Sequence, residues 1–103
     1  MAVTYAIRFD VVPEQRERFL TLLNGVLDAM RDEPMFHNAL LQQDAEDENR
    51  FLLVETWEDH DDVLNYQLSR PYRQAYHDAL PELLTGPREF SVWTPLRADY
   101  RRD

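Results

Sequence analysis

The sequence contains no cysteine and only two glycines, and each scarcity removes a class of site. Without cysteine the chain can form no disulfide, thiolate nucleophile, zinc–cysteine site or iron–sulfur cluster. Gly25 and Gly86 lie too far apart in the sequence to form a dinucleotide-binding loop or a P-loop, the two common glycine-rich loops that bind phosphate. No run approaches the roughly 18 apolar residues of a membrane-spanning helix, and we expect no targeting leader at the start. The lack of cysteine fits a cytoplasmic protein, which is the location we expect.

Positive charge is also in short supply. Eleven basic residues stand against twenty acidic ones, which gives a formal net charge of −9. Nucleic-acid backbones and anionic membranes repel such a protein, so we expect neither as a partner. The 103 residues predict one domain over residues 1–103. Because a chain this short buries its surface incompletely, self-association is plausible.

Hydrophobic spacing predicts the secondary structure. Apolar and polar residues alternate over residues 3–11, which is typical of a strand. Helical spacing follows from Pro13 to about Arg31, carried by Phe19, Leu23, Val26 and Met30. The remaining elements are strands at 35–43, 50–57 and 89–96, helices starting near 58 and 71, and a polar tail at 98–103. Pro81 should bend or restart the last helix.

The order β-α-β-β-α-α-β predicts an α+β fold close to the split ferredoxin-like motif, an antiparallel sheet with helices on one face. In the third strand, residues 51–54 are all apolar, which suggests that both faces of the sheet are buried at this strand. Phe90 and Trp93 would lie on opposite sides of the last strand. We therefore expect the second face to be covered by another copy, giving a homodimeric α/β barrel.

Six short segments resemble one family. The sequence resembles the antibiotic biosynthesis monooxygenase (ABM) superfamily of small dimeric α+β barrels from the first strand to Pro95. Each segment is a weak motif alone, and the resemblance rests on their order and spacing. The segments are 9–14, 32–34, 49–51, 55–58, 69–72 and 84–88.

The resemblance implies several activities. Some members oxidise quinols or polyketide phenols with dioxygen and no cofactor, some degrade haem, and one branch, similar around residues 85–88, isomerises a phosphorylated quorum-signal derivative. Many members place a histidine where this chain has Tyr66, and a glycine where it has Met35. The haem ligand would fall on Tyr76, whereas the histidine follows at His77, about 100° around a helix. We therefore expect no haem.

The leading prediction is a cofactor-independent monooxygenase that acts on a small quinol or phenolic compound, with dioxygen as its other partner. Dioxygen is a triplet and reacts poorly with closed-shell organic molecules, so the substrate must first become electron-rich by losing a proton. The protein then needs a base, hydrogen bonds to the oxyanion and a dry aromatic pocket. No cofactor or metal is required.

Four residues are predicted to be catalytic. His37 and Asn38 are neighbours on a strand and should point to opposite faces, so that one faces the helices. A histidine can act as the base and an asparagine can donate to an oxyanion. Tyr66 could donate to a developing oxyanion, and His77 could titrate near a bound anion. The structural alternatives are an edge hydrogen bond, an interfacial tyrosine and a solvated helical pair.

Substrate binding is predicted for an aromatic and cationic set. Trp57 would form a pocket wall or plug the core. Arg73 stands four residues before His77 and would meet an anionic substrate or form a solvated pair with it. Tyr72 and Tyr76 could line the pocket or belong to the core. His60 lies in an acidic run and should be solvated, since metal ligands normally converge from separate elements.

Two alternative functions stay open. One is isomerisation of a phosphorylated dione, in which Arg88 would bind the phosphate, although the sequence places no second basic residue close to it. The other is a small-molecule binding protein without turnover, which the replacement of a family histidine by Tyr66 would permit.

Overall fold

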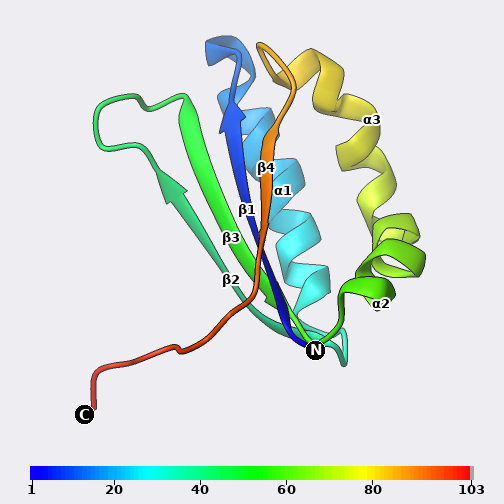
Figure 1. Cartoon of the computed structure of the whole chain (residues 1–103). Coiled ribbons are helices and arrows are strands. Elements are labelled where there is room, and N and C mark those ends of the chain that lie inside the picture. The colour runs from blue at the N-terminus through cyan, green and yellow to red at the C-terminus, as the bar shows by residue number, and fades with distance from the viewer. Residues whose placement is uncertain (103) are drawn as a thin grey trace.

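The computed structural model describes residues 1–102 as a four-stranded antiparallel sheet with the helices on one face (Figure 1). The strand order is β2-β3-β1-β4, which confirms the predicted ferredoxin-like α+β class. The last residue of the predicted tail, Asp103, lies outside the described residues. The elements are β1 (Val3–Asp10), the 3₁₀ turn η1 (Pro13–Gln15), α1 (Arg16–Met30), β2 (Phe36–Gln43), β3 (Arg50–Trp57), α2 (His60–Asn65), the turns η2 (Gln67–Ser69) and η3 (Pro71–Arg73), α3 (Gln74–Leu83) and β4 (Glu89–Trp93).

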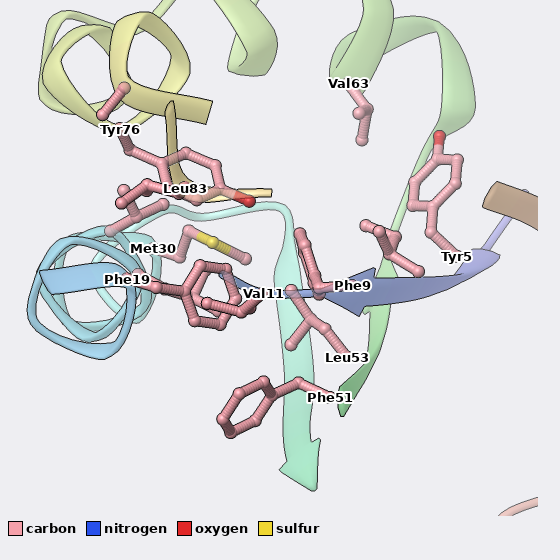
Figure 2. Close-up of a cluster of buried hydrophobic side chains, with 14 of the residues drawn as sticks. Tyr5, Phe9, Val11, Phe19, Met30, Phe51, Leu53, Val63, Tyr76 and Leu83 are labelled. Atoms are coloured by element: carbon pink, nitrogen blue, oxygen red, sulfur yellow. The ribbon is translucent and has the colours of Figure 1, made fainter. Parts of the chain in front are cut away.

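The core lies between the sheet and α1 and α3. Alternate residues of β1 are buried because successive side chains of a strand point to opposite faces. The predicted apolar stripe of α1 is buried against them. Figure 2 shows these layers meeting, with Phe19 of α1 beside Phe9 of β1. Their ring centroids lie 5.0 Å apart. The alternation and the helical stripe are therefore both confirmed.

Two strands end earlier than the sequence predicts. Residue Val11 forms only an isolated bridge to Leu84, so β1 stops at Asp10. β4 stops at Trp93, three residues short of the predicted end, where it pairs with Thr4 near the start of β1. Pro95, which cannot donate a backbone hydrogen bond, follows two residues later.

The helices follow their predicted breaks with one difference. Asp59 caps α2 by accepting from the backbone N–H of Asp62. Arg70 has extended backbone, and Pro71 occupies the first position of the next turn. Of the two effects predicted for Pro81, a bend or a restart, the restart does not occur. Instead α3 continues through this proline and ends two residues later, at Leu83.

A β-bulge shifts the register of β2. Phe36 pairs with Trp57 and Asn38 pairs with Thr56, so His37 is an extra residue without a partner on β3. The ring of Phe36 meets that of Trp57 edge-on at 5.2 Å, on the helix side of the sheet. Asn38, like Thr56, therefore lies on the opposite face.

The face of the sheet opposite the helices carries large apolar side chains exposed to solvent. Leu52 alternates with the buried residues of β3, and Leu40 and Trp93 lie on the flanking strands. This face also holds Ala6 and Val54. We call these five residues the outer sheet face. Within residues 1–102, no helix is long and apolar enough to cross a membrane.

Candidate functional site

A cavity of about 320 Å³ lies between the inner face of the sheet and helices α1, α2 and α3. Its walls are largely apolar, and an apolar surrounding strengthens electrostatic interactions relative to bulk water. Figure 2 shows Tyr5 on β1 with its hydroxyl toward α2, and Tyr76 extending from α3 across the sheet. Leu23, Val26, Met30, Leu53 and Val63 are among the apolar lining residues.

Arg73 brings a positive charge into this cavity. The residue is only 5% exposed and enters from η3. Its guanidinium carbon lies 5.8 Å from the ring centroid of Trp57 and 5.6 Å from that of Tyr72, so two aromatic faces hold it. Two of its nitrogens, Nε and Nη2, are buried with no hydrogen-bond partner. Such unpartnered donors are costly to bury.

Glu55 brings a carboxyl group into the same cavity. It lies on the inner face of β3, is 6% exposed and accepts a hydrogen bond of 3.2 Å from the Trp57 indole. Burial raises the pKa of Glu55 above its usual value of 4.5, while Arg73 and the indole act in the opposite direction.

His77 and Arg88 form the boundary between the cavity and an adjoining groove, together with Phe90. Burial lowers the pKa of His77 below its usual value of 6.5, and the cations Arg88 and Arg73 lower it further. His77 is therefore neutral at pH 7 and able to accept a proton. Burial raises the pKa of the Tyr76 phenol, so this residue enters the cavity as a neutral donor.

A tyrosine–histidine pair stands at another side of the cavity. The hydroxyl of Tyr5 lies 2.7 Å from Nδ1 of His60, and the ring of Tyr5 stacks on Phe90 at 5.4 Å. Burial raises the pKa of Tyr5 to about 12, with the nearby Glu55 and Asp59 carboxylates adding to the shift. His60 lies at a partly exposed helix start, as predicted, and its ring in addition contacts Tyr5 on β1.

The structure brings three of the predicted site residues to the cavity, namely Arg73, Tyr76 and His77. Trp57 is fully buried and does not line the cavity, but its ring contacts the guanidinium of Arg73 and its indole N–H donates to Glu55. Tyr72 is partly buried beside the same guanidinium. Arg73 and His77 are thus not the solvated pair that the structural alternative described.

The other three predicted site residues lie outside this cavity. Tyr66 is 61% exposed. His37 and Asn38 both line a hollow over the outer sheet face, where His37 bonds to Glu58. The expectation that one of these two faces the helices is wrong, because the bulge interrupts the alternation of β2 at that point.

Sequence reasoning missed Glu55 and undervalued Arg88. The alternation of β3 could have identified Glu55. Its side chain points to the core face, as those of Leu53 and Trp57 do, and it is the only charged residue of β3 on that face. Arg88 has no basic neighbour in the sequence, but the fold brings Arg73 to the same cavity. Within the described part of the chain, no cluster of three histidine, aspartate or glutamate side chains could hold a metal ion.

Comparison with known proteins gives concordant results. The family model described as Antibiotic biosynthesis monooxygenase matches residues 2–79. A protein of Pestalotiopsis microspora named "Putative monooxygenase GME11364" is 32% identical over 94 residues, covering 90% of this chain and 78% of the relative.

Solved structures agree in fold. The structure of Rv0793 from Mycobacterium tuberculosis has a TM-score of 0.85 at 24% identity, covering 97% of this chain and 100% of the other. SnoaB, a cofactor-independent oxygenase from Streptomyces nogalater, has a TM-score of 0.78 at 23% identity and covers 94% of this chain and 95% of its own. At these identities the likeness establishes the fold alone.

Proposed function

This chain belongs to the antibiotic biosynthesis monooxygenase family, and from that premise we propose that it is a cofactor-independent monooxygenase of a small quinol or phenolic compound. The observation that carries the proposal is the buried Arg73, a residue that lines an apolar cavity and whose guanidinium has two nitrogens without hydrogen-bond partners. Such donors favour the ionised form of a phenol over the neutral form. The name of the Pestalotiopsis relative and the activity of SnoaB support the same reaction class.

The chemistry follows from the weak reactivity of dioxygen toward neutral phenols. Loss of the phenolic proton leaves an electron-rich phenolate that can transfer electrons to dioxygen. For a hydroquinone, one dioxygen then gives one hydroxyquinone and one water, so the substrate loses four electrons and dioxygen gains four. One oxygen atom enters the ring, and the other leaves as water.

The chain's own residues supply the surroundings for this reaction. Arg73 binds the phenolate oxygen, and the apolar side chains of α1 and β3 hold the ring and exclude water. His77, neutral and at the border with the groove, carries protons between the cavity and solvent.

The direct test is oxygen uptake with a panel of quinols and anthrone-like phenols. We expect one dioxygen consumed per substrate, with a higher KM for Arg73→Met and an unchanged KM for Arg31→Met, in which the replaced arginine is exposed. A folded wild-type protein that consumes no oxygen with any member of the panel contradicts the proposal.

A second candidate is the isomerisation of a phosphorylated dione. It is favoured by the two guanidinium groups of Arg73 and Arg88 on one cavity, because a phosphate carries two negative charges near neutral pH. This reaction proceeds without dioxygen. Turnover of such a dione under strict anaerobiosis, together with failure of the quinol panel, would select it over the oxygenase.

We also propose that the protein is a homodimer assembled through the outer sheet face. Apolar residues exposed on a sheet face without helices support this assembly, because a second copy would remove them from water. Each copy would keep its own cavity on the helix side.

A further inference from the structure

We propose that Glu55 is the catalytic base of this cavity and takes the phenolic proton of the substrate while Arg73 binds the resulting oxyanion. The inference rests on the proposed function and adds the residue that performs its first step. Neither the motifs in the sequence nor the names of the related proteins assign this role.

The first support is the position of the carboxyl group. Glu55 is buried on the inner face of β3, where it lines the cavity beneath the helices. The Trp57 indole binds one carboxylate oxygen, Oε1, and leaves the other free to meet a ligand. A general base must lie within hydrogen-bond reach of the proton that it removes, and a carboxylate at the cavity wall meets that condition for a ligand in the cavity.

The second support is the relationship between Glu55 and Arg73. A purely structural buried pair would bond directly, because an unpaired charge is costly in the interior. Here the carboxylate bonds to Trp57, while Nε and Nη2 of Arg73 stay unpartnered. Both side chains line one cavity, so a ligand hydroxyl placed between them could donate to the carboxylate and accept from the guanidinium.

The proton transfer is balanced in charge. The phenolic O–H bond breaks, the proton goes to Glu55, and the electron pair stays on the substrate oxygen beside Arg73. One negative charge therefore moves from carboxylate to substrate, and the net charge of the cavity does not change. Because no new charge is created in an apolar space, the step avoids the large penalty of burying an additional ion.

The surroundings of Glu55 also suit a base. Burial raises its pKa, which brings its basicity closer to that of the phenol. Arg73, Arg88 and the Trp57 indole keep the carboxylate accessible as an anion. Tyr5 and Tyr76, which line the same cavity, have raised pKa values and stay neutral where Glu55 titrates. His77 also lines the cavity, and burial lowers its pKa, which makes it a weaker base than an ordinary imidazole.

The kinetic test compares Glu55→Gln with Glu82→Gln. Glutamine keeps an oxygen that can accept from Trp57, and Glu82 is an exposed residue on α3 whose loss changes the net charge equally. We expect Glu55→Gln to lower kcat/KM by at least about a hundredfold. The increase of wild-type activity with pH that accompanies ionisation of Glu55 should be absent in this variant. Glu55→Asp should recover part of the rate. Equal rates in Glu55→Gln and wild type overturn the inference while leaving the oxygenase proposal intact.

A second kinetic comparison varies the acidity of the substrate. Phenols that are already ionised at the assay pH need no base, so the deficit of Glu55→Gln should shrink as the substrate becomes more acidic. A deficit that is the same for every substrate would indicate a structural defect and overturn the inference.

A binding measurement needs no turnover. 4-Nitrophenol is a suitable probe, because its phenolate is yellow and its neutral form is not. We expect Glu55→Gln to bind the phenolate more tightly than wild type, since a neighbouring negative charge is removed and Arg73 remains. Weaker or unchanged phenolate binding overturns the inference. Tighter binding in the variant without any oxygen uptake by wild type overturns the oxygenase proposal alone.

Discussion

The indole of Trp57 donates a hydrogen bond to the carboxylate of Glu55, two residues earlier on the same face of β3. The indole is fully buried, so it fixes the carboxylate at the base of the cavity rather than letting it turn toward solvent. This bond explains how a strand of apolar residues tolerates a charged one. It also leads to a prediction on stability, because the fold holds Glu55 where ionisation is penalised.

The stability of the wild-type protein relative to Glu55→Gln should fall as pH rises. The pKa of Glu55 is raised in the folded state, so the folded protein retains its proton where the unfolded chain has lost it. The contribution of Glu55 is fully present below the usual value of 4.5 and is lost as pH rises through the higher folded pKa. Urea denaturation across this range measures it. A stability difference that does not vary with pH contradicts the prediction.

Arg73→Met should stabilise the fold while impairing substrate binding. Methionine removes two buried nitrogens without partners, which cost about 1–3 kcal/mol each, and gives up buried contacts with Trp57 and Tyr72 worth about 1–2 kcal/mol each. We expect a net gain of about 1 kcal/mol in the free energy of unfolding. Arg31→Met, which changes an exposed residue, should shift it by less than about 0.5 kcal/mol. A loss of stability in Arg73→Met would mean that the guanidinium serves the fold.

Most of the fold could be predicted because it depends on local periodicity. The alternation of β1 and the stripe of α1 reflect which side chains face one core, and these patterns are visible in a single sequence. The end of β4 could not be predicted from its own residues. Its last paired residue, Trp93, lies opposite Thr4 of β1, and the register of this pairing cannot be read from residues 89–96 alone.

The site was predicted where it lies on helices. Arg73 and His77 are four residues apart, and the helical turn brings both to the cavity wall. The prediction failed at His37, because one unpaired residue in β2 turns the following side chains to the other face and nothing local in the sequence marks it. Glu55 was not predicted as a site residue, because it directly follows the apolar residues 51–54, which indicate a strand that serves core packing.

The Tyr5–His60 pair should couple β1 to the start of α2. Tyr5→Phe removes the hydroxyl that lies 2.7 Å from the imidazole, and we expect the free energy of unfolding to fall by about 1 kcal/mol. Combining it with His60→Ala should cost less than the sum of the two single changes, since both remove the same bond. Thermal or urea denaturation of the four proteins measures the coupling, and strict additivity would show that the bond contributes nothing.

Tyr66→Phe should leave oxygen uptake unchanged. The family resemblance predicts a role at this position, yet the phenol is exposed and does not line the cavity. A hydroxyl in water makes no contact with a bound ring, so its removal should alter neither kcat nor KM. The matched comparison is Tyr76→Phe, which changes a phenol on the cavity wall and should lower kcat/KM. A slower Tyr66→Phe enzyme would restore the predicted catalytic role and imply that the α2 region closes over the substrate.

Leu52→Asp should convert the proposed dimer to monomers. Leu52 lies on β3 at the centre of the outer sheet face and is 38% exposed, so the substitution is tolerated by an isolated chain. In a dimer it would bury a carboxylate near its symmetry-related copy, which is strongly unfavourable. Tyr66→Asp, on the helix side, introduces the same charge away from that face and should keep the assembly. Sedimentation of the three proteins at micromolar concentration distinguishes the outcomes, and a wild type that is monomeric there removes the proposed interface.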